Sequence, residues 1–167
     1  MRKQTTVTTE LGTAIGEQIQ DHGAEYIRDF SPRSVHFFYD DEVIEAGTCP
    51  AIGVLFRGFD REEDSVRGRN DDGTVAAGYA LMNYRYEIQI WHKAAVRDTL
   101  NINLRSWGDA VTALFEDIFD LDNSNVSVNA TAGNPTDELE IGGVFLAAMP
   151  IALNLKVFRL QGATTLP

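Results

Sequence analysis

Few side chains in this 167-residue sequence are of the types that catalyse reactions. The histidines, His22, His36 and His92, are widely separated in the sequence, and none lies in a recognised catalytic motif such as a G-x-S-x-G nucleophile turn. The only cysteine, Cys49, follows an acidic stretch at 40–45, whereas a reactive thiolate needs positively charged neighbours. We therefore expect histidines on the surface or on sheet faces, a half-buried structural Cys49, and no enzymatic activity.

Acidic side chains are the other candidates for chemistry. Asp120, Asp122 and Ser124 have the spacing of the first three ligands of a calcium loop. However, Asn125 stands where that loop requires glycine, and Thr131 stands where it requires an acidic residue. The segment is better interpreted as the polar end of a helix. With no phosphate-binding glycine motif and a single cysteine, the sequence predicts neither a metal site nor a cofactor.

A polar, glycine-punctuated segment at 58–77 stands out from its apolar flanks. Its length and composition predict a long charged loop, and such loops in compact domains are usually functional or disordered. Large aromatic residues are frequent anchors of protein interfaces, which makes Phe38, Phe59 and Trp91 candidates, and the alternative is that they are ordinary core residues. We predict that an interface or channel surface is formed by Phe59, Asp60, Glu62, Glu63, Asp64, Asp71, Asp72 and Trp91.

The elements that must position these residues follow from hydrophobic periodicity. Apolar residues at steps of three and four predict helices over 8–30 and 99–119, the second with Asp98 as its N-cap. Alternation and apolar runs predict strands over 34–39, 50–56, 79–95, 126–130, 139–148 and 151–160, with Pro150 at a bend or an edge.

This order of elements indicates an α+β fold, in which a mostly antiparallel sheet packs against two main helices and carries one long charged loop. The length favours a single domain over 1–167, with flexible ends at 1–7 and 161–167.

The net charge restricts the partners. With 14 Lys and Arg against 25 Asp and Glu, the chain carries a formal charge of −11, which opposes binding to nucleic-acid phosphates or to anionic membranes. No signal peptide and no membrane-spanning stretch is predicted, because the N-terminal residues are polar and Pro150 interrupts the longest apolar segment. We expect a protein made in a reducing cytosol.

The order of motifs resembles that of the tail-terminator, or tail-completion, proteins of long-tailed bacteriophages. The resemblance covers about residues 8–160 and consists of element order, length and pattern. After an N-terminal amphipathic helix come Cys49-Pro50-Ala51-Ile52-Gly53-Val54, a Tyr-x-Tyr-x-Ile-x-Ile strand at 84–90, a helix containing Trp107-Gly108-Asp109-Ala110-Val111, and a last strand ending near Lys156-Val157-Phe158.

The resemblance implies a structural virion protein at the junction of tail and neck, assembled in the host cytoplasm. It implies a ring, expected to be a homohexamer, that caps the tail tube protein, contacts a neck or connector protein, and lets DNA pass through without specific binding. A negative channel would repel phosphates, and its candidate lining is the 60–72 loop together with Glu116 and Asp117.

Two alternatives stay open. Within the structural class, the chain could be another head–tail connector component or a tail tube subunit. From another class, it could be a small α+β enzyme or ligand-binding domain that uses an aromatic pocket around Tyr84, Trp91 and Trp107.

Overall fold

A computed structural model describes residues 7–64, 79–118 and 126–160 of the chain. Two main helices, α1 (Val7–Tyr26) and α2 (Arg97–Ile118), accompany a six-stranded sheet. The strands are β1 (His36–Phe38), β2 (Ala51–Asp64), β3 (Tyr79–Ala94), β4 (Val126–Ala132), β5 (Leu139–Ile141) and β6 (Val144–Leu160). A short 3-10 turn, η1 (Pro32–Ser34), precedes β1, and a second, η2 (Ala46–Thr48), lies in the connection between β1 and β2. The expected α+β fold is confirmed.

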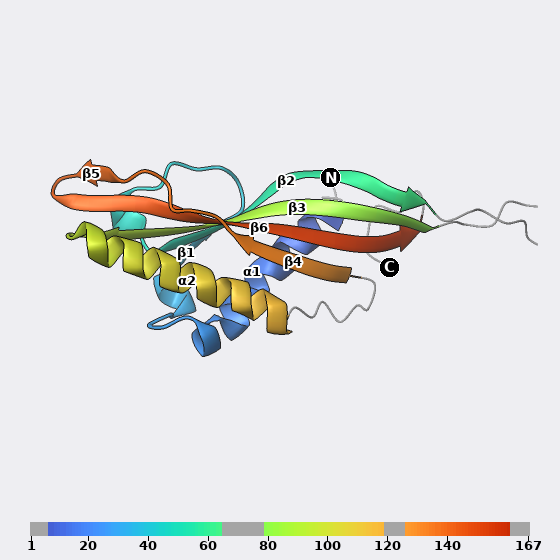
Figure 1. Ribbon diagram of the computed structural model, residues 1–167, viewed down its shortest axis with the longest axis horizontal. Helices are drawn as coiled ribbons and strands as arrows, with labels where there is room; N and C mark the ends of the chain where they lie inside the picture. The colour runs from blue at the N-terminus through green and yellow to red at the C-terminus, as the bar shows by residue number, and fades with distance from the viewer. Residues whose placement is uncertain (1–6, 65–78, 119–125, 161–167) are drawn as a thin grey trace, which may run out of the picture.

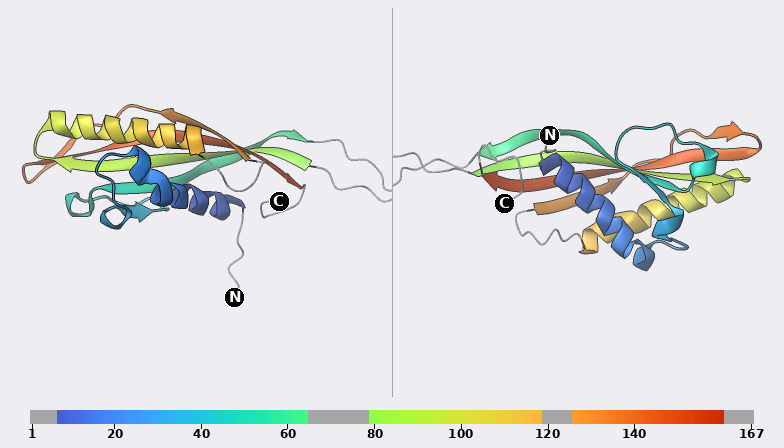
Figure 2. Two further views of the ribbon diagram at one scale, coloured as in Figure 1. Left: turned by 90° about the horizontal axis from the view of Figure 1, so that it is seen from below. Right: turned by 180° about the vertical axis from the view of Figure 1, so that it is seen from behind.

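The sheet has the order β1-β2-β3-β6-β4, and β5 pairs with the first residues of β6. All pairs are antiparallel except β1 with β2, which makes the sheet mixed but mostly antiparallel. Both helices cover one face of this sheet, and the views in Figure 1 and Figure 2 show the other face free of helices. We call the helix-free side the open face.

The main core lies between the helices and the sheet, and alternation along the strands decides which residues enter it. In β3, Tyr84, Tyr86 and Ile88 point toward the helices and are at most 3% exposed. Leu11, Ile15 and Ile19 of α1 and Leu100, Leu104 and Val111 of α2 complete the core from the other side, each at 0% exposure. The apolar stripes predicted for both helices are therefore the buried ones.

The glycines of α1 make room for aromatic side chains. A Cβ atom at Gly16 would lie 2.9 Å from the Tyr39 ring, and one at Gly23 would lie 2.6 Å from the Phe30 ring. Glycine weakens an isolated helix by about 1 kcal/mol relative to alanine, so packing within the chain supplies the support that this helix needs. The helix ends at Tyr26 rather than at residue 30, and Asp29 adopts a left-handed conformation with φ of 59°.

Several predicted boundaries are wrong for physical reasons. The segment 139–148 is divided by a hairpin turn, in which Gly142 and Gly143 have φ of 61° and 80°, as a type I′ turn requires. The predicted break at Pro150 does not occur, because β6 is continuous through that residue. Helix α2 begins at Arg97, so Asp98 lies in its first turn and is not the residue before it.

Pro150 is accommodated because its ring nitrogen faces the end of β4. Gly133 N–H donates to the Pro150 carbonyl at 2.9 Å, and in a strand the N and O of one residue point the same way. A backbone N–H at position 150 would therefore point toward Gly133, just after β4 ends. For this reason the proline removes no hydrogen bond between β6 and β3. Pro150 therefore lies at an edge only in a local sense, because β4 ends beside it while β3 pairs with the other side of β6.

Candidate functional site

The charged segment begins as a strand and not as the predicted loop. Residues 58–64 extend β2 along β3, with register shifts between Phe56 and Gly58 and between Arg61 and Glu63. Gly58 has φ of 122°, which favours glycine at the first of these bulges. Of the predicted channel residues, Asp60, Glu62, Glu63 and Asp64 lie on this strand, whereas Asp71 and Asp72 fall outside the described residues.

Phe59 remains a candidate interface residue, because it is 54% exposed. It stacks on Tyr84 with 5.6 Å between ring centroids and lies 6.2 Å from Phe56, which is itself 38% exposed. These rings lie on the helix-covered side of the sheet, since Phe59 pairs with Tyr84 and Phe56 with Tyr86. The result is a short strip of accessible aromatic surface beside the free edge of β2.

Trp91 and Phe38, the other two candidate anchors, both belong to the open face of the sheet. Phe38 is only 4% exposed and belongs to a second hydrophobic core on the open face, formed by Phe38, Ile44, Ala51 and Leu55. Trp91 packs against this second core and is half-buried. Phe38 is therefore a core residue, the alternative interpretation given for it above, whereas Trp91 stays a half-buried candidate.

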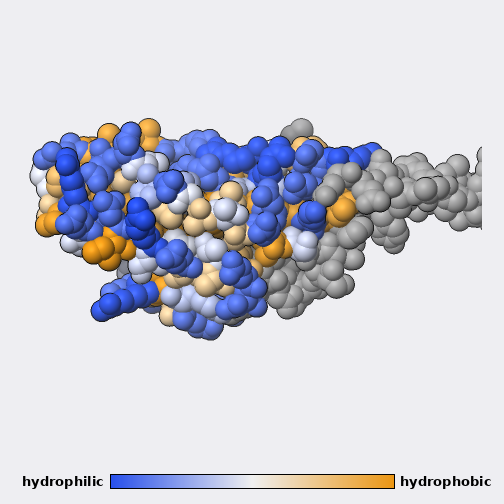
Figure 3. All heavy atoms as spheres, in the orientation of Figure 1, coloured by the Kyte–Doolittle hydropathy of each residue, from blue (hydrophilic) through white to orange (hydrophobic). Residues whose placement is uncertain are grey.

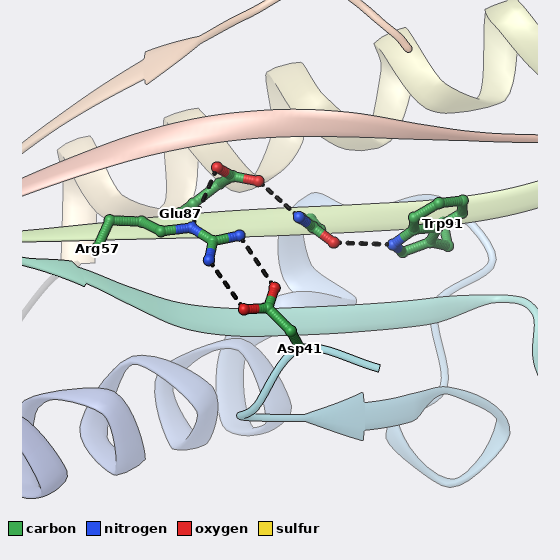
Figure 4. Close-up of polar contacts among 5 residues, drawn as sticks. Asp41, Arg57, Glu87 and Trp91 are labelled. Carbon is green, nitrogen blue, oxygen red and sulfur yellow. Dashed lines mark hydrogen bonds and ion pairs between the residues drawn. The ribbon is translucent and has the colours of Figure 1, made fainter. Parts of the chain in front are cut away.

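A chain of polar contacts runs along the open face to Trp91 (Figure 4). Arg57 donates to both carboxylate oxygens of Asp41, at 3.2 and 3.3 Å, and its Nε donates to Glu87 at 3.4 Å. Gln89 Nε2 then donates to Glu87 at 2.6 Å, and Trp91 Nε1 donates to Gln89 at 3.1 Å. Hydrogen bonding to Asp41 raises the pKa of Arg57 further above its ordinary value. Sequence patterns did not reveal this network, because Asp41 and Arg57 are 16 residues apart.

A second ion pair joins Arg85 Nη1 to Asp60 at 2.9 Å on the same face. Arg57 and Arg85 also line a hollow of about 470 Å³, whose other walls include Thr131, Pro150 and Ala152. Asp60 is thus partly neutralised, and this limits its contribution to a negative surface.

The exposed side of α1 carries acidic side chains and no basic ones. Helix α1 contains no Lys or Arg, and Glu17, Asp21 and Glu25 succeed one another at steps of four on its exposed side. Tyr26 donates to Asp117 Oδ2 at 3.4 Å, which places the acidic end of α2 next to the end of α1. The absence of positive charge from 7–26 was a signal available in the sequence.

His92 is buried at the helix-covered side of β3, at 9% exposure. Its ring contacts Trp107 edge-on at 4.2 Å, and Nε2 has no hydrogen-bond partner within the described part of the chain. Burial lowers the pKa of His92 to about 4. It lines a pocket of about 310 Å³ with Arg28, Asp29, Asn103 and Ser106, while His22 lies on α1 and His36 on β1.

The alternative aromatic pocket is contradicted by the geometry. Tyr84 faces the helices, Trp91 lies on the open face, and Trp107 packs inside the helix layer against Phe30 and His92. The sheet itself separates the first two residues, so no common pocket exists.

Hydrophobic residues also reach the surface at the end of the molecule that carries β5, as Figure 3 shows. In β5, Leu139 is 55% exposed and Ile141 is 57% exposed.

Within the described ranges, no group of three His, Cys, Asp or Glu is arranged to hold a metal ion. No described helix has the length and apolarity needed to cross a bilayer. No known protein family matches the chain, and no curated protein matches it.

Proposed function

We propose that the chain is a non-enzymatic structural subunit that assembles head-to-tail into a ring. The observation that carries this proposal is a pair of free sheet edges on opposite sides of the same sheet. β1 covers β2 only over Ala51 to Gly53, and within the described residues no strand pairs with the outer side of β2 beyond this point or of β4. Such edges are templates for pairing with another chain.

The directions of these edges support head-to-tail pairing of identical copies. β2 is antiparallel to β3, β3 to β6, and β6 to β4, so β2 runs antiparallel to β4. When identical copies stand side by side in one orientation, the β4 edge of one can pair antiparallel with the β2 edge of the next. An interface of this kind uses two unlike surfaces, and it forms a closed ring when the rotation between neighbouring copies divides a full turn, and an open filament otherwise. The bulges and charges of β2 limit indiscriminate pairing.

The chemistry of the surface supports a tail terminator within this class. The resemblance in the order of elements comes from the sequence, and the acidic side of α1 is suited to a passage through which DNA slides without being bound. On this proposal the ring, a hexamer by analogy with the family, sits at the tail–neck junction of a virion. It contacts the tube protein and a neck protein, and its other candidate role is a neighbouring connector component or a tube subunit.

The free edge of β4 offers a sharp test. Because Gly133 N–H points to β6, alternation directs the N–H of Ala130 away from β6 and that of Asn129 toward it. Ala130→Pro should therefore remove an outward donor while keeping the contacts with β6, and Asn129→Ser serves as a matched control.

We expect the wild type and Asn129→Ser to form a ring by light scattering and electron microscopy, alone or on tail tubes. Ala130→Pro should stay monomeric with an unchanged circular dichroism spectrum. A wild type that remains strictly monomeric at high concentration, and also in the presence of tubes, would refute the ring and favour a ligand-binding or enzymatic role.

A further inference from the structure

The connection between β1 and β2 covers the open face of the sheet. Residues 40–49, which we call the strap, arch over β2 on the side opposite the helices (Figure 1). Ile44 of the strap is 7% exposed and packs into the second core with Phe38, Ala51 and Leu55. The neighbouring Val43 is 90% exposed, so the strap inserts one side chain into the sheet and leaves the next in solvent.

One ion pair and one hydrogen-bonded contact fasten the strap to the sheet. Asp41 receives two hydrogen bonds from Arg57 of β2 (Figure 4), and Glu42 contacts His36 of β1 at 2.5 Å. Both contacts are accessible to solvent, with the Asp41 and Glu42 side chains 77% and 42% exposed. Exposed pairs of this kind contribute little stability and are weakened by salt.

The hydrogen bonds of the strap are largely local. Thr48 N–H and Thr48 Oγ1 both donate to the Glu45 carbonyl, at 3.0 and 2.8 Å, and Cys49 N–H donates to Ala46 at 3.3 Å. These contacts can survive when the strap leaves the sheet. The main core on the helix side does not depend on them, because it is built by other residues.

We infer that residues 40–49 open as a separate unit, exposing the apolar strip of the second core while the helix-covered side of the sheet stays folded. Segments held by few apolar contacts and by solvent-exposed polar contacts lie at the low end of the local stability scale. Opening would uncover Phe38, Ala51 and Leu55 next to Trp91. The open face thus has two surfaces, a polar one when the strap is closed and an apolar one when it is open.

Cys49, the only cysteine, reports on this opening. It packs against the second core, and burial raises the pKa of its thiol to about 11. Because the thiolate is the reactive form, alkylation by iodoacetamide should be slow while the strap is closed. The measured rate at pH 8 then follows the fraction of molecules with an open strap.

Asp41→Asn is the decisive variant, and Asp60→Asn is its control, since it breaks the Arg85–Asp60 pair on the same face outside the strap. We expect alkylation of Cys49 to become about 2–5-fold faster in Asp41→Asn, and to be unchanged in Asp60→Asn. Ile44→Ala should accelerate it by at least about tenfold, because the apolar anchor is lost.

The dependence on urea distinguishes local from global opening. A strap that opens alone exposes little surface, so the wild-type rate should rise with urea far less steeply than the global unfolding constant. Equal urea dependence of the two, or equal acceleration by Asp41→Asn and Asp60→Asn, would overturn the inference. Both results are independent of whether the chain forms a ring.

Discussion

The packing of aromatic rings against glycines of α1 can be tested with two alanine substitutions in the same helix. A Cβ atom at Gly12 would lie 3.5 Å from Tyr86, an ordinary van der Waals contact. A Cβ atom at Gly23 would lie 2.6, 2.9 and 3.0 Å from three atoms of the Phe30 ring. The substitutions are chemically identical, so their difference isolates the steric contact.

The expected magnitudes follow from two opposing effects. Each substitution gains up to about 1 kcal/mol from the higher helix propensity of alanine. At Gly12 nothing opposes this gain, and the free energy of unfolding should rise by about 1 kcal/mol. At Gly23 the Phe30 ring must move, although it is only 8% exposed and packs edge-on against Trp107 at 5.8 Å. Overpacking typically costs about 1–3 kcal/mol, so Gly23→Ala should be destabilising by about 1 kcal/mol net.

Urea denaturation followed by circular dichroism at 222 nm would measure both values. The two variants should differ by about 2 kcal/mol, or several degrees in melting temperature for a chain of this size. In a Phe30→Ala background the penalty at Gly23 should disappear, because the ring that it displaces is absent. If Gly23→Ala stabilises the protein as much as Gly12→Ala does, the proposed role of the glycines is wrong.

Three further outcomes are expected. Because the pKa of His92 is about 4 when folded and 6.5 in the unfolded reference, stability should fall by up to about 3 kcal/mol as the pH decreases from 6.5 to 4. Denaturation across this range should show a smaller loss in His92→Leu, and equal losses would contradict the burial. Gly53→Ala should cost about 1–3 kcal/mol in thermal unfolding, because its Cβ would lie 2.3 Å from the Phe38 ring. Tyr86→Phe should cost about 1 kcal/mol in urea, because it removes the hydrogen bond to the Thr8 carbonyl, and an unchanged midpoint would argue against that bond.

Local periodicity was sufficient to predict a helix or strand where one side of that element is buried. The step of three and four in 99–119 correctly predicted α2, and the alternation in 79–95 correctly predicted β3 to within a residue. That same alternation already places Tyr84 and Trp91 on opposite faces, so the shared aromatic pocket could have been rejected from sequence. The acidic residues on the exposed side of α1 were likewise present in the sequence, together with a lack of Lys and Arg over 7–26.

Pairing between strands decided the features that local patterns did not predict, because the stability of a strand depends on the strand beside it. Residues 58–64 look like a loop by composition, yet β3 holds them as a strand with two bulges. Pro150 looks like a break, yet it lies in a continuous strand because its nitrogen is directed to the end of β4. The ion pair between Asp41 and Arg57 also depends on the return of the chain over the open face. Composition and periodicity determined the elements and the charge of this protein, while contacts between distant segments determined which edges and surfaces are free to bind.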